Sequence, residues 1–529
     1  MVTRRSTHAN HAKPSTASKR RANRRAASKS APLYAGGKAN ARGGHVGNVA
    51  GFGTGSGGSS RGAAPSVGNV AGYGTGSANV KSGGAHRRTT SPSKSHATPR
   101  AATGVNTSGP RIPTPSGGEI LLTRRHFLFG ALGIGALAAV GGGAAVVAQQ
   151  MDKDPDADLT VLKVPASAVT SSDSLASVDD YSTRMSLTGS YELPYGTLVW
   201  ANDEHVAACL LPAESAKPLT HVALLALGSG VSTTVLEGAV GLGEGFEIYD
   251  VRATSSGLVW TEADILDGIW RIYTARSAGS GIGEPVLVEE GNADYETPSI
   301  AAVGNRAFWQ VLPKPKGAKK AESSLLKRAT MGASDTEVVY TSRGRMATPP
   351  YASNDSVIIT PRTDTSSIHY QLTCIDANSG NVKDSLALPV SMKPLEAGYG
   401  KTGFTFSFDA GYDYGDGISK VGTYTPTAAA TNADYSNAPW FWFGRAPSAP
   451  PAWCGKYFMV KSTTAVCGVD FATSEYFAFD VESGADDYGE YLASTGSHDT
   501  VVTFANIDHV PLGGEPVKCC RVRVWTPTA

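Results

Sequence analysis

Apolar residues from Thr183 to the C-terminus come in short runs that are separated by Gly, Asn, Asp and Pro. Nowhere in this region do apolar residues recur at a helical spacing over a useful length. Short runs between turn residues are typical of strands. The pattern therefore predicts an all-β body.

Seven segments of this body are similar to one another, and each follows a Gly, Asn or Asp turn. Such residues accept positive φ at low cost, as a tight hairpin requires. The intervals between matching apolar positions are 60, 49, 50, 47, 54 and 44 residues, close to the period of propeller blades. The segments are GTLVWAND, SGLVWTEA, NRAFWQVL, NDSVIITP, KTGFTFSF, GKYFMVKS and HDTVVTFA, and the positions are Trp200, Trp260, Trp309, Ile359, Phe406, Val460 and Phe504.

A second apolar run follows each segment, as in IWRIYTAR, and a third often follows it, as in EPVLVEEG. This order predicts a β-propeller of about seven four-stranded blades over residues 183–529, with a pair of β-sandwiches as the alternative. A propeller ring must close, because an open ring exposes strand edges. The last repeat stops at Thr526-Pro527 after its third strand, so we expect residues 159–164 or 184–187 to supply the fourth.

The repeats resemble those of TolB-like β-propellers, in which a Pro-led strand and a glycine turn precede the strand that lines the blade. TPSIAAVGNRAFW and TPPYASNDSVIIT carry this resemblance. It extends from about Thr183 to the C-terminus, and the unit from Trp260 to Trp309 shows it most clearly.

Residues 127–148 form a continuous apolar stretch that is long enough to cross the ~30 Å hydrocarbon core as a helix. Two arginines precede the stretch, and acidic residues follow it between residues 152 and 158. Positive charge stays on the cytoplasmic side, so the body is expected outside the cytoplasm. A buried core helix is the alternative, but the charged flanks favour the membrane.

The residues around these arginines resemble the twin-arginine export motif: a hydroxyl residue, two arginines, and then Phe-Leu. Phe129 stands where the motif usually has Lys. The resemblance implies that the translocation machinery exports the body already folded. Val146-Val147-Ala148 offers a small-residue cleavage site, but the long leader and the length of the apolar run favour a retained anchor. The motif residues are Thr123, Arg124, Arg125, Phe127 and Leu128.

Charge divides the chain in two. Residues 1–125 hold twenty Lys or Arg and one acid, a formal charge of +19, and the remainder has 27 basic and 45 acidic residues, or −18. Residues 1–122 are rich in Gly, Ser and Ala, so they are expected to form a disordered basic tail. Residues 123–150 are the signal or anchor, and residues 151–182 an acidic linker. Basic clusters can dock on an anionic leaflet, but nothing indicates a nucleic-acid fold, so no nucleic-acid partner is expected.

All six cysteines lie in the body, where export permits disulfides. Cys454 and Cys467 are close in sequence and are the predicted pair, with buried, inert thiols as the alternative. No Cys/His spacing suggests zinc, and no metal site is predicted. Asp409, Asp413 and Asp416 make an acid-rich loop that lacks the pattern of an EF-hand, so solvated turn residues are favoured over calcium.

No catalytic constellation is predicted, because the body has no GxSxG elbow and no phosphate-binding glycine loop. No cofactor is expected either. Glu204-His205 follows Trp200 and could act as an acid/base pair. A surface histidine without a catalytic role is the simpler interpretation.

Aromatic residues are dense around residue 440, in a segment that we expect to be a loop. Exposed aromatic patches mark binding sites, so this cluster is a candidate stacking surface for a glycan or peptide, with packing between blades as the alternative. The candidate residues are Trp440, Phe441, Trp442, Tyr412 and Tyr414.

Two functions agree with these features. The first is a membrane-tethered or exported extracytoplasmic propeller that acts as a binding or scaffold module for a cell-envelope glycan or protein. The second is an exported propeller enzyme, a hydrolase or lyase acting on glycans. The side chains that line the central channel distinguish the two, since fold alone does not imply function.

Overall fold

The computed structural model describes residues 159–214, 217–264, 266–316, 322–365, 367–408, 414 and 417–528, and the backbone of a short hairpin formed by β1 (Arg111–Pro113) and β2 (Glu119–Leu121). The predicted tail, export motif and membrane span otherwise lie outside these residues. Within the described part of the chain, no helix is long and apolar enough to cross a membrane.

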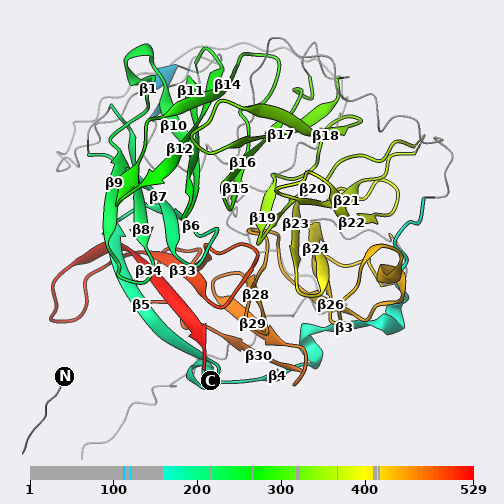
Figure 1. The fold of residues 1–529 in the computed structure, drawn as a ribbon. Helices are drawn as coiled ribbons and strands as arrows, with labels where there is room; N and C mark the ends of the chain where they lie inside the picture. The colour runs from blue at the N-terminus through cyan, green and yellow to red at the C-terminus, as the bar shows by residue number, and fades with distance from the viewer. Residues whose placement is uncertain are drawn as a thin grey trace, which may run out of the picture. The chain divides into compact units, whose positions relative to one another are not determined.

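Seven sheets, each built on four antiparallel strands, make up the body, and Figure 1 shows them arranged as a ring. Three of the sheets carry one or two additional strands. The predicted β-propeller is confirmed, and we number its blades 1 to 7 in chain order. Blade 1 contains β6 (Leu198–Trp200), β7 (Val206–Pro212), β8 (Thr220–Ala226) and β9 (Ser232–Leu236). Blade 2 contains β10 (Glu247–Thr254), β11 (Gly257–Asp264), β12 (Ile269–Ala278) and β14 (Val286–Gly291), with a short β13 (Gly281–Ile282). Blade 3 contains β15 (Ile300–Val303), β16 (Arg306–Val311), β17 (Ser324–Thr330) and β18 (Thr336–Ser342), and blade 4 contains β19 (Tyr351–Ser353), β20 (Ser356–Ile359), β21 (Gln371–Asp376) and β22 (Val382–Ala387).

Blades 5 to 7 repeat the arrangement, with one difference in blade 7. There the three C-terminal strands are joined by β5, which comes from the start of the body. Blade 5 contains β23 (Glu396–Gly400), β24 (Gly403–Phe408), β25 (Gly422–Pro426) and β26 (Trp440–Phe443). Blade 6 contains β27 (Ala452–Cys454), β28 (Tyr457–Lys461), β29 (Val466–Asp470) and β30 (Glu475–Ala478). Blade 7 contains β31 (Tyr491–Leu492), β33 (Val501–His509), β34 (Val517–Pro527) and β5 (Met185–Pro194).

Hydrophobic cores lie between neighbouring blades, and each pair of neighbours shares one. The core between blades 7 and 1 includes Val522 and Cys209, so the ring is closed by packing as well as by strand pairing. Because both faces of a blade are covered, adjacent strand residues point into different cores. Trp440 packs between blades 4 and 5, whereas Phe441 packs between blades 5 and 6. The other pairs share cores of the same kind.

The fourth strand of blade 7 comes from upstream, as the sequence predicts. β5 pairs with β34 from Met185 to Pro194, so the second of the two predicted segments closes the ring. The first segment has another role. Val161 bridges Ala387 at the outer strand of blade 4, where Leu162 and Val164 are buried.

Residues 159–184, which we call the belt, continue along the outer edges of blades 5 and 6. Strand β3 (Val169–Ser171) pairs in parallel with β26, and β4 (Ala176–Ser177) pairs in parallel with β30. Three 3-10 turns alternate with these strands: η1 (Ala166–Ala168) precedes β3, η2 (Ser172–Ser174) lies between β3 and β4, and η3 (Tyr181–Thr183) follows β4. The belt thus covers the outer edges of these two blades before β5 closes the ring.

One part of the repeat alignment is wrong. Trp200 lies in the innermost strand of blade 1, whereas the other six matched positions lie in second strands. The second strand of blade 1 is β7, so its counterpart lies near Cys209. The misplacement explains why the first interval, 60 residues, is longer than the others.

The predicted disulfide between Cys454 and Cys467 is also wrong, since all six cysteines are free and buried. Cys454 lies in β27 and Cys467 in β29, with β28 between them. Strands two positions apart are separated by roughly 9–10 Å, beyond the Cα–Cα distance that a disulfide spans. The two cysteines are close in sequence, but the intervening strand β28 keeps them apart in the sheet.

Candidate functional site

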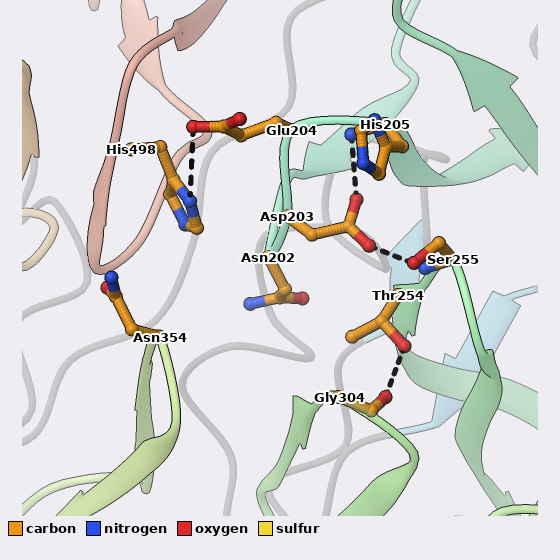
Figure 2. Close-up of a pocket in the computed structure, with 9 residues that line it drawn as sticks. All are labelled: Asn202, Asp203, Glu204, His205, Thr254, Ser255, Gly304, Asn354 and His498. Carbon is orange, nitrogen blue, oxygen red and sulfur yellow. Dashed lines mark hydrogen bonds and ion pairs between the residues drawn. The ribbon is translucent and has the colours of Figure 1, made fainter.

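Polar residues from several blades surround a cavity of about 300 Å³ at the end of the ring where first strands turn into second strands (Figure 2). We call it the turn-side cavity. Blades 1 to 4 each contribute their first turn, and a segment that leads into the second strand of blade 7 completes the wall. The lining residues are Asn202, Asp203, Glu204, His205, Thr254, Ser255, Gly304, Asn354 and His498.

The turns that form the wall depend on residues that tolerate positive φ. Gly304 and Asn354 adopt φ values of 54° and 50° in the two-residue turns of blades 3 and 4. Two-residue hairpins of this kind need positive φ, and Gly and Asn adopt it at low cost. The turn residues noted in the sequence repeats therefore form the site as well as the hairpins.

Asp203 holds the first two turns together. Its Oδ1 accepts hydrogen bonds from the backbone N–H groups of His205 and Val206, both at 2.9 Å. Its Oδ2 accepts one from the N–H of Ser255, in the turn of blade 2, at 2.5 Å. Both carboxylate oxygens are thus occupied, so Asp203 positions the wall of the cavity.

Residues 493–499, which we call the crossing segment, join the first and second strands of blade 7 and contact blades 1, 4 and 6. The N–H of Thr495 donates to the carbonyl of Ala201 in blade 1 at 3.1 Å. The carbonyl of Gly496 accepts from Trp453 in blade 6 at 2.8 Å. Within the segment, β32 (Ser497–His498) adds a parallel strand to the inner edge of blade 6. The crossing segment thereby brings His498 to the turns of blades 1 and 4.

His498 and Glu204 lie beside each other at the wall of the cavity, as Figure 2 shows. Nδ1 of His498 lies 3.8 Å from Oε1 of Glu204, and the same oxygen accepts a hydrogen bond from the N–H of Asp499 at 2.5 Å. The side chain of His498 is 13% exposed. The carboxylate and the imidazole are therefore neighbours at the wall of the cavity.

Two polar atoms at this cavity have no hydrogen-bond partner among the described residues: Oδ1 of Asn202 and Nε2 of His498. Asn202 is only 9% exposed, and its Nδ2 donates to Oγ1 of Thr495 at 3.0 Å. A buried polar atom without a partner is costly, and in native proteins it calls for a water, an ion or a ligand. These two atoms make the cavity the candidate site.

A second cavity, of about 320 Å³, adjoins the first at Asn354. Lys383 lines it, with Nζ 2.9 Å from each carboxylate oxygen of Asp355.

The buried thiol of Cys454 contacts the crossing segment, where it donates weakly to the carbonyl of Asp499 at 3.6 Å. Burial raises the pKa of this thiol to about 12, so it stays protonated at neutral pH.

The aromatic candidates do not form a stacking surface. The expected loop is strand β26, and Trp440 and Phe441 are fully buried in it, so the prediction of exposed ligand contacts is wrong for both. Trp442 is half-buried, with Lys420 Nζ 4.7 Å from its ring centroid, and β3 of the belt pairs alongside it. Tyr414 packs edge-on against Phe408. Tyr412 lies outside the described residues.

The other candidates fall as follows. His205 is exposed, and the imidazole beside Glu204 is that of His498, so the suggested pairing of adjacent residues is corrected. Asp409, Asp413 and Asp416 lie outside the described residues. Within the residues that are described, no three His, Cys, Asp or Glu side chains are grouped to hold a metal ion.

Sequence reasoning missed Asn202, Asn354 and His498. Each belongs to, or adjoins, the Asn- and Asp-containing turn of a repeat, so the repeat alignment held a signal for them. It did not show that the turns converge on one cavity.

No family model matches the chain, and no curated protein matches it either. Among solved structures it is similar to a prolyl endopeptidase, at 9% identity and a TM-score of 0.38 over 63% of this chain and 46% of that one. It thus spans about half the length of that enzyme. It is also similar to an oligogalacturonate lyase in complex with manganese (10% identity, TM-score 0.37, 66% of this chain and 95% of that one) and to a polysaccharide lyase (7%, 0.38, 63% and 90%). Similarity at this level carries no argument about activity.

Proposed function

We propose that the chain is a membrane-tethered, extracytoplasmic β-propeller that acts as a binding module for a cell-envelope ligand, with the turn-side cavity as its site. The observation that carries the proposal is the pair of unpartnered polar atoms, on Asn202 and His498, at a cavity built by several blades. A cavity of about 300 Å³ is at the small end of ligand sites, so it suits one sugar-sized group. A glycan is therefore favoured over a protein surface.

Binding is tested with the purified full chain and soluble glycan fragments released from the cell envelope, by titration calorimetry. Asn202→Ala combined with His498→Ala should reduce affinity at least tenfold, because two hydrogen-bond partners are lost. Asn437→Ala is a matched control, since Asn437 is exposed in the 3-10 turn η5 (Asn432–Asn437) of blade 5. If the double variant binds the fragments as tightly as the wild type, the cavity is not the site.

The extracytoplasmic location is a separate part of the proposal and rests on the twin-arginine motif. Arg124→Lys combined with Arg125→Lys should retain the protein in the cytoplasm. Protease treatment of intact cells should then digest the body of the wild type and spare that of the variant. A wild-type body that is protected from protease contradicts this location.

One observation favours an enzyme as a second candidate. The carboxylate of Glu204 lies 3.8 Å from the imidazole of His498 at a cavity, and a carboxylate beside an imidazole is suited to general acid/base catalysis. A hydrolase or lyase would release new reducing or unsaturated ends from the same glycan fragments. His498→Gln should abolish that release, whereas a binding module produces none from the wild type.

A further inference from the structure

Two polar atoms at the turn-side cavity have no partner among the described residues, and both can accept a hydrogen bond. One N–H of the Asn202 amide donates to Thr495, and its Oδ1 is available to accept. When Nδ1 of His498 carries its proton toward Glu204, Nε2 is an acceptor as well. Two such acceptors are complementary to a ligand group that is rich in donors.

Charge at the cavity points the same way. Of the nine lining residues, two are carboxylates, Asp203 and Glu204, and none is Lys or Arg. The Asp203 carboxylate is partly neutralised by three backbone N–H groups. Glu204 accepts one such bond, at Oε1, and its side chain is 36% exposed. Like-charged walls concentrate ligands of the opposite sign, so this cavity favours a cation over an anion.

We infer that the turn-side cavity binds a sugar bearing a primary ammonium group, an inference that rests on the proposed glycan-binding function. An ammonium offers three N–H donors and one positive charge, which matches Oδ1 of Asn202, Nε2 of His498 and the carboxylate of Glu204. Ser255 and Asn354 also line the cavity, and the Ser255 hydroxyl and the Asn354 amide N–H groups are suited to ring hydroxyls. N-acetylation of the sugar removes the charge and two of the donors, so acetylated and free amino sugars should differ strongly.

Three probes with the same ring test the inference: glucosamine, N-acetylglucosamine and glucose. Titration calorimetry of the full chain in detergent at pH 7.0, where an ordinary imidazole is mostly neutral, should give glucosamine at least a tenfold higher affinity than the other two. That preference should weaken as ionic strength rises, since partly exposed charges are screened. Equal affinity for all three overturns the ammonium inference but leaves the glycan-binding function standing. Failure of all three sugars and of the envelope fragments to bind overturns both.

Two variants act on the preference in opposite directions. Glu204→Gln should reduce glucosamine affinity about tenfold with little effect on glucose, and its amide oxygen can still accept from the N–H of Asp499. Asn202→Asp should increase glucosamine affinity, a gain that misfolding cannot imitate. Glu237→Gln is the control, because this carboxylate is 85% exposed and is not among the lining residues. An unchanged preference in both cavity variants overturns the inference.

A peptide amine carries the same ammonium group from a different source. Lysine methyl ester, which has no sugar ring, should bind at least tenfold more weakly than glucosamine. If it binds as tightly, the cavity recognises an amine without a sugar, and the saccharide part of the inference falls.

Discussion

The phenol of Tyr351, at the inner strand of blade 4, accepts a hydrogen bond from the N–H of Gly496 at 2.6 Å and donates one to the carbonyl of Pro451 at 2.7 Å. One buried hydroxyl thus links three parts of the ring: blade 4, the crossing segment and the start of blade 6. Burial raises the pKa of Tyr351 well above its usual range, so the hydroxyl keeps the proton that it donates.

Tyr351→Phe should lower the free energy of unfolding by about 1–3 kcal/mol, because a buried N–H and a buried carbonyl both lose their partner. It should also loosen the crossing segment that carries His498. Urea unfolding measures the first effect, and hydrogen exchange at Gly496 the second. Tyr476→Phe, at a half-buried position in the outer strand of blade 6, is the control. Unchanged exchange at Gly496 would contradict the linking role.

Ring closure depends on β5 more than on the belt that precedes it. Replacing residues 185–194 with Gly and Ser should leave the outer edge of β34 unpaired, and the protein should aggregate. The same replacement of residues 159–184 should cost roughly 3 kcal/mol or more through loss of the buried Leu162 and Val164, yet leave a monomer. Size-exclusion chromatography with light scattering, and thermal unfolding, distinguish the two. A monomeric, cooperatively unfolding β5 replacement would contradict closure by this strand.

The ring could be predicted from the sequence because each blade leaves a pattern that lies within a short stretch of the chain. A turn residue followed by an apolar strand recurs once per blade, and each recurrence is visible within a few residues of the chain. The alignment failed at Trp200, since the first blade places an apolar run in its innermost strand too and either run fits the pattern. The upstream closing strand was predictable from physics, because an unpaired outer edge at the C-terminus needs a partner.

The site could not be predicted in the same way. Glu204 and His498 lie at opposite ends of the body in sequence and meet only because the ring closes. The predicted binding surface from Trp440 to Trp442 was wrong for a related reason. Aromatic residues on neighbouring strand positions normally require one exposed face, but a propeller blade buries both of its faces against other blades.

All six cysteines should react as free thiols. In denaturant without reductant, DTNB should titrate six thiols per chain, and in the native protein the reaction should be slow. Burial raises the pKa of Cys209 to about 12 and that of Cys467 to about 11, so little of the reactive thiolate forms at neutral pH. Four thiols in denaturant would indicate one disulfide and would restore the prediction that the structure contradicts.

Trp440→Ala should destabilise the protein by about 3–5 kcal/mol, as truncation of a core aromatic does. The indole is fully buried between blades 4 and 5, and its Nε1 donates to the carbonyl of Tyr435 at 2.9 Å. Trp442→Ala should cost less, because that side chain is only half-buried. Urea unfolding of both variants measures the difference. If Trp440→Ala keeps wild-type stability and instead loses ligand affinity, the segment is a binding surface after all.

Lys461 should make the stability of the protein depend on pH in the alkaline range. Burial lowers the pKa of this lysine to about 8, although Glu490 and Asp486 oppose the shift. Its Nζ donates to the carbonyls of Thr463 and Tyr488, which hold it in place. Between pH 8 and the unfolded value near 10.5, the unfolded chain binds more protons at this residue than the folded chain. Its contribution to the free energy of unfolding therefore rises with pH in that window and is constant below it.

The measurement is the difference in unfolding free energy between the wild type and Lys461→Met, taken at pH 7, 8, 9 and 9.5. The difference is needed because the buried thiols act in the opposite sense: their raised pKa values make the folded chain retain protons that the unfolded chain loses above about pH 8.5. The thiols of Cys209 and Cys374 are present in both proteins and do not interact with Lys461, so their effect cancels. The wild type should gain on the variant by up to about 1.4 kcal/mol per pH unit above pH 8. A difference that stays constant across these pH values would mean that Lys461 titrates normally in the folded protein.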